Sequence, residues 1–236
     1  MRSVLAQVPE VESMLDLRRS TTLFYQDQPA DSLYYLDEGL AKMTRTNAAG
    51  DHIILCIRGR GDLVGEEALG GDHGRYESEV EILTPANVYR IPRAPLQTAL
   101  MQHPEWVLPF VSYILERQQA LAYKVELLCL HDVEYRVLEF LADLAMLVKP
   151  LADSSGSQIP ITQLELADLV GATRETTSTT LNQLERRGLV KLSRRMLTIP
   201  SPEILRSAAQ NRNGNAPRQN QDDAASMGAG GAFAAS

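Results

Sequence analysis

Hydrophobic side chains between residues 161 and 199 recur at the spacing of two short helices. A capping box precedes the first helix, because Thr162 and Glu165 can each hydrogen bond to the backbone of the other. This helix should begin at Gln163, and its apolar face comprises Leu164, Ala167, Leu169 and Val170. Gly171 should end the helix, since glycine adopts the left-handed conformation there without strain.

Thr173 is placed to cap a second helix, which should run from Arg174 to Arg187. Gly188 would be the C′ residue of that helix. The residues that recur at i, i+4 and i+7, and so point inward together, are Thr177, Leu181 and Leu184. The turn between the two helices is short enough to hold them at a fixed angle, as a helix-turn-helix unit requires.

Polar residues occupy the outer side of the first turns of this second helix: Arg174, Glu175, Ser178 and Thr179. A recognition helix inserts this N-terminal end into the major groove of DNA. Arginine can bind a guanine edge through two hydrogen bonds, glutamate can accept from the cytosine amino group, and Ser and Thr can bond to either base or to a phosphate. These four residues are therefore the predicted base readers.

Two strands, 189–192 and 196–199, should follow around the turn 193–195 and form a basic wing. The residues predicted to contact DNA phosphates are Thr173, Arg186, Lys191, Arg194 and Arg195. A second interpretation stays open at this point. The same pattern fits a two-helix packing unit whose polar end is only solvated, because short motifs also occur by chance.

The charge of the chain changes along its length. Over all 236 residues, 23 Lys and Arg against 30 Asp and Glu give a net charge of −7, which alone argues against a nucleic-acid partner. Residues 1–150 carry 14 basic against 22 acidic residues, whereas residues 161–200 carry six against four. An acidic body with a basic DNA-binding head is the distribution expected of a DNA reader.

Short β-like segments separated by turns fill residues 22–92, after an amphipathic opening. The predicted strands are 32–36, 40–46, 52–57, 79–83 and 87–91. The sequence NAAGD at 47–51 should form a hairpin turn. Strands at such even spacing predict an antiparallel barrel or jelly roll.

Helical spacing returns over residues 95–131, and a helix from Glu105 to Leu130 would be ~39 Å long. An alternating 3,4 spacing, typical of a coiled-coil seam, relates Val111, Ile114, Gln118, Leu121, Val125 and Leu128. The alternative is an ordinary buried amphipathic helix. We favour dimerisation, because a reader of palindromic DNA needs a two-fold axis.

The helix after this seam, over residues 133–148, should be capped by Asp132 and pack through Val137, Leu138, Leu141 and Leu144. His131 and Asp132 are therefore the predicted hinge between domains. Residues 151–158, LADSSGSQ, should form a linker. The sequence after Arg206 is poor in large apolar residues, so the tail is expected to be disordered.

The segment GATRETTSTTLNQLERRGLV resembles the DNA-reading helix of the cyclic-AMP receptor and fumarate-nitrate regulator (CRP/FNR) family, where G-x-S-R-E-T-V-x-R-x-L is typical. In addition, YYLDEGLAKM resembles a strand pair of the family's cyclic-nucleotide-binding barrel, and GDLVGEEAL resembles its phosphate-binding cassette. The resemblance spans about residues 20–200. One departure is Thr179, which stands where the family has a second base-reading arginine.

The resemblance implies an effector pocket, whose candidate residues are Gly65, Glu66, Arg75, Leu121 and Ala122. In relatives that bind cyclic AMP, a glutamate holds the ribose hydroxyl and an Arg-Ser pair holds the phosphate. Glu66 fits the first role, but Tyr76 and Glu77 align with the Arg-Ser pair, and only the neighbouring Arg75 could substitute. Leu121 and Ala122 stand where a Thr-Ser pair would meet the adenine. We therefore expect an effector other than cyclic AMP, or none.

Other sensing chemistries find little support. An iron-sulfur cluster needs four thiolates, and the chain has only Cys56 and Cys129. Haem would need an axial ligand, for which His52 with Cys56, or Cys129 with His131, are the candidates. An ordinary core thiol is the favoured role for each cysteine. We expect no metal site and no catalytic activity, because no nucleophile-and-base constellation is evident.

The sequence thus predicts an α+β chain with a jelly-roll sensor domain and dimerisation helix over residues 1–131, a winged helix-turn-helix domain over 132–206, and a tail over 207–236. Few cysteines and no stretch long enough to cross a membrane favour a cytoplasmic protein. The expected partners are double-stranded DNA, a second copy of the chain and RNA polymerase. The alternative function is a small-ligand-binding module whose helix-turn-helix serves protein contacts.

Overall fold

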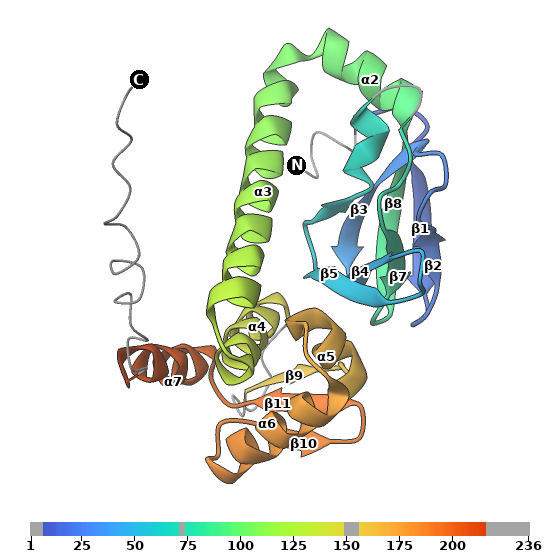
Figure 1. The fold of residues 1–236 in the computed structure, drawn as a ribbon. Coiled ribbons are helices and arrows are strands. Elements are labelled where there is room, and N and C mark those ends of the chain that lie inside the picture. The colour runs from blue at the N-terminus through green and yellow to red at the C-terminus, as the bar shows by residue number, and fades with distance from the viewer. Residues whose placement is uncertain (1–6, 71–73, 149–155, 216–236) are drawn as a thin grey trace, which may run out of the picture.

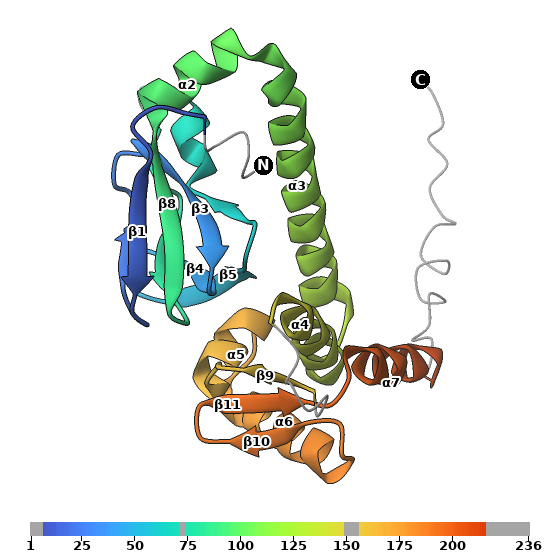
Figure 2. The ribbon, with the colours of Figure 1, turned by 180° about the vertical axis from the view of Figure 1, so that it is seen from behind.

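The computed structural model describes residues 7–70, 74–148 and 156–215, which form a β-sandwich, a long helix and a smaller C-terminal domain (Figure 1). The long helix, α3 (Val107–Leu130), runs beside the β-sandwich and ends at the C-terminal domain. The view from behind shows the same arrangement, with α7 extending from the C-terminal domain on the side of α3 away from the strands (Figure 2). This is the predicted order of a β-domain, a long helix and a C-terminal helical domain.

Two four-stranded antiparallel sheets form the β-sandwich, in the orders β1-β8-β3-β6 and β2-β7-β4-β5. Their strands are β1 (Glu12–Leu17), β2 (Thr22–Phe24), β3 (Ser32–Glu38), β4 (Ala41–Thr46), β5 (His52–Arg58), β6 (Leu63–Val64), β7 (Glu79–Ile82) and β8 (Ala86–Pro92). All five predicted strands are present, with ends shifted by one or two residues. The sequence pattern missed β1, β2 and β6. The last two are short, and the pairing register of β1 shifts between Met14 and Leu17.

Both faces of β3 are buried, which explains why its sequence SLYYLDE does not alternate between apolar and polar residues. Tyr34 and Leu36 face the core between the two sheets. Leu33 and Tyr35 face a second core, which the helices on the outside of the sandwich cover. The helical residues of that second core are Leu96, Ala99, Trp106 and Phe110.

The helical segment after β8 is broken into three elements: α2 (Arg93–Gln102), a 3₁₀ turn η2 (Pro104–Trp106) and α3. The predicted start of the long helix at Glu105 is therefore two residues early, because Glu105 lies in the 3₁₀ turn. Most of the predicted seam is solvent-exposed in the single chain: Val111, Ile114, Gln118, Leu121 and Val125. Leu128 differs, since it is half-buried beside Gly171.

The C-terminal domain comprises α4 (Val133–Leu147), β9 (Ser157–Ile159), α5 (Gln163–Val170), α6 (Arg174–Arg186), β10 (Lys191–Ser193), β11 (Met196–Ile199) and α7 (Pro202–Asn215). Asp132 caps α4 as predicted and accepts the Tyr135 N–H. The wing has three strands in the order β10-β11-β9. The predicted linker 151–158 is therefore wrong at its end, where Ser157 and Gln158 pair with β11; residues 151–155 lie outside the described residues.

The predicted disorder after Arg206 is wrong for residues 207–215, which continue α7. Leu205 and Ala209 are fully buried in the core of the C-terminal domain. Arg212 also forms ion pairs with the Asp132 and Glu134 carboxylates at 2.7 and 2.9 Å. The small residues of α7 suffice to hold this helix in place because α4 supplies the apolar surface on which it packs. Residues 216–236 lie outside the described part of the chain.

Candidate nucleic-acid interface and ligand pocket

Local hydrogen bonds fix the turn between α5 and α6. The Thr162 hydroxyl accepts the Glu165 N–H, and the Glu165 carboxylate accepts the Thr162 N–H at 2.9 Å, so the predicted capping box is present. Gly171 has φ +64°, and a Cβ atom there would lie 2.8 Å from a methyl group of Leu128. The Thr173 hydroxyl accepts the Thr176 N–H. The two helices therefore form one rigid unit that also contacts the end of α3.

The faces of α6 agree with the helical spacing. Thr177, Leu181 and Leu184 are fully buried. Arg174, Glu175 and Thr179 are exposed, whereas Ser178 is half-buried. Three of the four predicted base readers are thus accessible at the start of the helix.

The wing brings basic side chains to the same surface. Arg174 of α6 lines a groove of about 440 Å³ with Arg194 and Arg195 of the turn between β10 and β11. None of these three guanidinium groups forms a hydrogen bond or an ion pair with any residue that the structure describes. Exposed guanidinium groups without protein partners are suited to phosphate oxygens and base edges.

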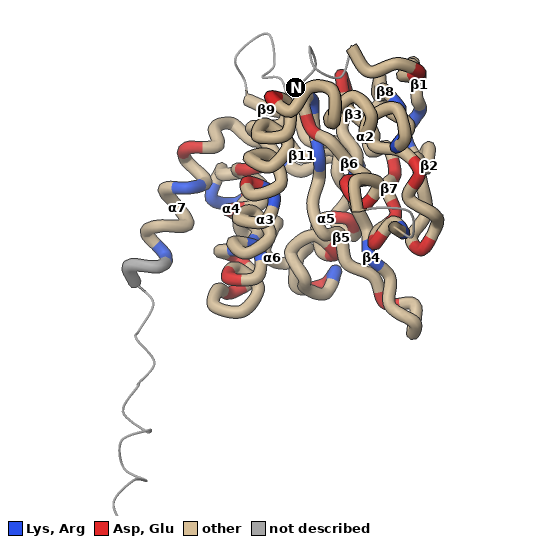
Figure 3. The backbone as a smooth tube through the Cα atoms, turned by 90° about the horizontal axis from the view of Figure 1, so that it is seen from above, with Lys and Arg blue, Asp and Glu red and all other residues tan. Residues whose placement is uncertain are grey.

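The remaining predicted phosphate contacts have different surroundings. Lys191 and Arg186 are exposed. Thr173 is exposed, but its hydroxyl already caps α6 and hydrogen bonds to the Thr176 hydroxyl at 2.9 Å. The neighbouring Arg187, which was not a predicted phosphate contact, forms an ion pair with Glu134 of α4 and so joins the end of α6 to α4. Figure 3 shows acidic residues in red recurring over the β-strands, as the charge distribution predicted.

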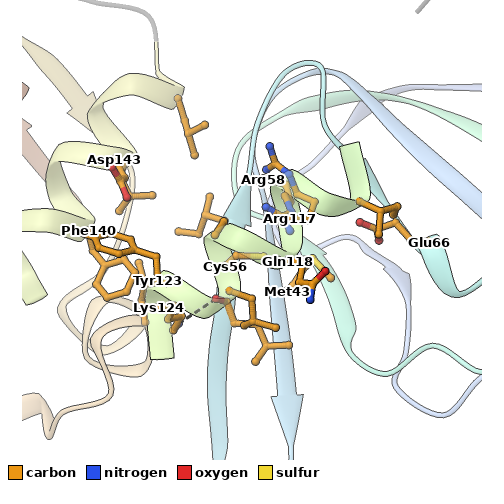
Figure 4. A pocket seen from close by; sticks show the side chains of 18 of the residues that line it. Met43, Cys56, Arg58, Glu66, Arg117, Gln118, Tyr123, Lys124, Phe140 and Asp143 are labelled. Atoms are coloured by element: carbon orange, nitrogen blue, oxygen red, sulfur yellow. Dashed lines mark hydrogen bonds between the residues drawn. The ribbon is translucent and has the colours of Figure 1, made fainter. Parts of the chain in front are cut away.

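A pocket of about 570 Å³ lies where the β-sandwich, α3 and the C-terminal domain meet. β4, β5 and the 3₁₀ turn η1 (Glu66–Gly70) form one side, α3 forms a second, and α4 with α5 closes the end. Figure 4 shows Arg58 and Arg117 close together on one side of this pocket, and Phe140 with Tyr123 and Lys124 on the other. The pocket thus has a charged side and a largely apolar side.

Two protein-family profiles match the chain. A cyclic nucleotide-binding domain matches residues 14–103, and a Crp-like helix-turn-helix domain matches residues 135–208. Together they cover most of the β-sandwich and of the C-terminal domain described above. The chain belongs to the CRP/FNR family of transcription regulators.

Individual relatives agree with this assignment. The cAMP-activated global transcriptional regulator CRP of Salmonella typhimurium is 28% identical over 170 residues, which cover 72% of this chain and 81% of the relative. The global nitrogen regulator of Synechocystis is 25% identical over 201 residues, which cover 84% and 88%. The solved structure of CLP, the c-di-GMP-responsive regulator of Xanthomonas campestris, is similar with a TM-score of 0.68 and 24% identity, covering 84% of this chain and 96% of CLP. The similarity to CLP, at 24% identity, shows a common fold.

The predicted effector residues of this CRP/FNR regulator do not all meet in the pocket. Glu66 and Leu121 line it, whereas Gly65, Arg75 and Ala122 are not among its lining residues. Burial raises the pKa of the Glu66 carboxyl. The Arg75 guanidinium donates to the Asp27 carbonyl instead. Arg75, the predicted substitute for the family's phosphate contact, is therefore engaged elsewhere.

Tyr76 and Glu77, at the positions of the family's phosphate-binding pair, have other partners. The Tyr76 ring is buried and stacks on Phe24 with centroids 3.7 Å apart, and its hydroxyl donates to the Ser32 carbonyl at 2.7 Å. The exposed Glu77 carboxylate pairs with Arg45 at 3.0 Å. Neither side chain offers a donor to a phosphate.

Three basic residues of the pocket were not among the candidates that the sequence suggested: Arg58, Arg117 and Lys124. Lys124 is buried and donates to the Ile54 and Leu55 carbonyls of β5, and burial lowers its pKa to about 8. Its Nζ also lies 5.2 Å from the centroid of the Phe140 ring. Helical spacing could have revealed Arg117 and Lys124. They share a second face of α3 with three apolar or aromatic residues, Phe110, Tyr113 and Leu127.

The haem and metal candidates have ordinary partners. His52 lies 3.2 Å from an Asp168 carboxylate oxygen, and the Cys56 thiol lies 3.4 Å from the Met43 sulfur. Cys129 is exposed, and His131 stacks on Tyr135. Among the described residues, no three His, Cys, Asp or Glu side chains converge as a metal site would require. No helix within the described ranges is long and apolar enough to cross a membrane.

A cluster of ion pairs joins the helix-turn-helix to the β-sandwich. The Glu165 carboxylate accepts two hydrogen bonds of 3.0 Å from Arg19 and one of 3.2 Å from Lys42. Burial raises the pKa of the Glu165 carboxyl. The hydrogen bonds from Thr162 and the charges of Lys42 and Arg19 lower it further than burial raises it, so the pKa lies below its usual value. Lys42 also pairs with Glu81 at 3.3 Å. The cluster fixes α5 against the β-sandwich.

Proposed function

We propose that this regulator is a homodimer that reads a palindromic operator with the first turns of α6. The observation that carries the proposal is the exposed Arg174 beside the wing arginines Arg194 and Arg195, none of which has a partner among the described residues. Arg174 and Glu175 would specify base pairs, and the wing would bind the phosphate backbone. Thr179 lacks the long arm of arginine, so it should leave one base pair less strictly defined.

The dimer would form along α3. Val111, Leu121 and Val125 are each about half exposed in the single chain, at 45%, 53% and 53%. Burying these side chains against the same seam of a second copy would remove apolar surface from water. A two-fold axis along α3 would then present two recognition helices to half-sites about one helical turn apart.

We further propose that operator binding does not depend on cyclic AMP, in contrast to the cAMP-activated CRP of Salmonella typhimurium. The stacked Tyr76 and the ion-paired Glu77 support this, because they leave no cation at the position of the phosphate pair. Leu121 and Ala122 cannot donate hydrogen bonds to a base. A ligand that hardly binds cannot shift the conformational equilibrium of the dimer.

As further partner we propose RNA polymerase, which a transcription regulator of this family would contact, and we propose a regulatory rather than an enzymatic role. The alternative, a helix-turn-helix used for protein contacts, would leave the wing arginines without a role.

Selection of bound sequences from a random DNA pool tests the proposed function. The full chain, alone and with cyclic AMP, cyclic di-GMP or other small anions, should enrich a palindrome with half-sites about one helical turn apart. The selected site should bind about a thousandfold more tightly than a scrambled one at the same salt concentration. If every pool sequence binds equally weakly under all these conditions, the operator-binding proposal is wrong and the protein-contact alternative is favoured.

A further inference from the structure

The pocket between the β-sandwich, α3 and the C-terminal domain contains a guanidinium group without an ion pair. The guanidinium group of Arg58, the last residue of β5, forms no hydrogen bond and no ion pair with any residue in the described ranges. Its Nε atom is buried and lacks a hydrogen-bond partner. A buried donor without a partner is costly, so such a group marks a place where a ligand atom can bind.

A second guanidinium lies beside it. Arg117 of α3 pairs with Asp62 at 3.3 Å and lies 4.9 Å from the centroid of the Tyr113 ring, yet its Nε is also buried without a partner. Figure 4 shows Arg58 and Arg117 pointing to the same side of the pocket. Asp62 pairs with Arg117, whereas Arg58 lies within ion-pair distance of no carboxylate in the described ranges, although Glu66 and Glu67 also line the pocket. Arg58 is therefore the guanidinium group whose charge is available to a ligand.

The opposite side of the pocket is apolar and belongs to the C-terminal domain. It is formed by Phe140, Leu144 and Leu147 of α4 and by Leu169 of α5. The exceptions are Asp143, which pairs with Arg206, and Lys124, whose ammonium group donates to carbonyls of β5. A volume of about 570 Å³ is ample for a small organic molecule.

We propose that this pocket binds an amphipathic anion, whose carboxylate or phosphate group contacts Arg58 and Arg117 and whose apolar body lies against Phe140 and Leu144. The inference builds on the proposed regulatory function and names the class of its effector. Arg58 thus replaces the phosphate contact that Tyr76 and Glu77 do not offer. Because the apolar body would touch α4 and α5 directly, occupancy would change how the helix-turn-helix packs on the sensor domain.

Isothermal titration calorimetry on the full chain, without DNA, tests the ligand class with three probes. These are decanoate, its neutral analogue decan-1-ol, and inorganic phosphate, which has a charge but no apolar body. Decanoate should bind at least tenfold more tightly than either of the other two. Across hexanoate, octanoate and decanoate the affinity should rise by up to about fourfold per methylene group. Decyl phosphate then distinguishes a phosphate from a carboxylate as the preferred head group.

The Arg58→Leu variant tests the site. It should lose on the order of tenfold or more in decanoate affinity and leave decan-1-ol affinity unchanged. Arg58→Lys should recover part of the loss. The exposed Arg60→Leu, two residues further along the chain, is the matched control and should bind decanoate like the wild type. If Arg58→Leu does not give the wild-type circular dichroism spectrum, Arg58→Gln replaces it, because glutamine keeps a polar side chain without the charge.

Three results would overturn the inference: equal binding of decanoate and decan-1-ol, no decanoate binding at millimolar concentration, or unchanged decanoate affinity in a folded Arg58 variant. Cyclic AMP that binds tightly and equally well to Arg58→Leu would also overturn it, because the effector would then use other contacts. A different result would contradict the proposed function alone. If the protein binds decanoate more tightly than decan-1-ol but shows no sequence-specific DNA binding, the operator-binding proposal is wrong and the proposed ligand class is unaffected.

Discussion

Replacing Glu165 by glutamine should measure how strongly the ion-pair cluster holds the helix-turn-helix on the β-sandwich. Glutamine has the same shape and can still complete the capping box with Thr162, so α5 keeps its start. The change removes the charge and replaces one carboxylate oxygen by an NH₂ group, which donates hydrogen bonds and cannot accept them. It leaves Lys42 and Arg19 facing a neutral amide, with their side chains 16% and 34% exposed.

The expected cost follows from the burial of the three groups. The Glu165 side chain is only 13% exposed and accepts charged hydrogen bonds from two cations. Such hydrogen bonds contribute about 1.5 to 3 kcal/mol each when buried, and the partial exposure of Arg19 reduces its share. We therefore expect Glu165→Gln to lower the free energy of unfolding by about 2 kcal/mol at pH 7.

The effect should depend on pH in a defined direction. The pKa of Glu165 is lowered in the folded protein, so its contribution to stability is present above the ordinary value of 4.5 and is lost as the pH falls through the folded pKa. Urea denaturation of both proteins should show the difference at pH 7 and a smaller difference below pH 4. The control is Glu12→Gln, whose exposed pair with Arg90 at 3.3 Å should contribute less than about 1 kcal/mol. Equal losses for the two variants, or a Glu165 effect unchanged in acid, would refute this reasoning.

Three further predictions concern charge, assembly and effector. Folded Lys124 loses its proton near pH 8, whereas the unfolded lysine keeps it to about 10.5. The free energy of unfolding of the wild type should therefore rise over that pH range by roughly 3 kcal/mol relative to Lys124→Met. A difference in unfolding free energy between the two proteins that does not vary with pH would contradict the assignment. Val125→Glu should make the protein monomeric in analytical ultracentrifugation, whereas Glu126→Gln, its neighbour, should stay dimeric. Micromolar cyclic-AMP binding with a tenfold gain in operator affinity would disprove cyclic-AMP independence.

The structure of the helix-turn-helix was predictable because local sequence determines it. The start of α5, its end at Gly171 and the N-cap Thr173 depend on hydrogen bonds between residues at most five apart, which the sequence displays directly. The central strands of the β-sandwich were predictable because turns and hydrophobic runs delimit them. The short strands β2 and β6 are stabilised by distant pairing, so no local pattern revealed them.

The pocket and the last helix depend on contacts between distant parts of the chain. The Lys124 ammonium group donates to carbonyls about 70 residues earlier in the sequence, and only the fold brings these groups together. Arg58 looks like an ordinary strand end until α3 and α4 cover it. Residues 207–215 looked disordered because alanine, asparagine and glutamine bury little surface, yet Arg212 and Ala209 bind to partners on or near α4. Composition alone cannot reveal such a partner.

The central claim, that the first turns of α6 read base pairs while the wing only binds phosphates, is tested most directly by comparing two variants in the same selection from random DNA. Arg174→Ala should lose about 1 to 3 kcal/mol on the selected operator and relax the preference at one base pair of each half-site. Arg195→Ala should weaken binding to all sequences alike and flatten the salt dependence. Equal loss of base preference in both variants, or unchanged preference in Arg174→Ala, would contradict the assignment.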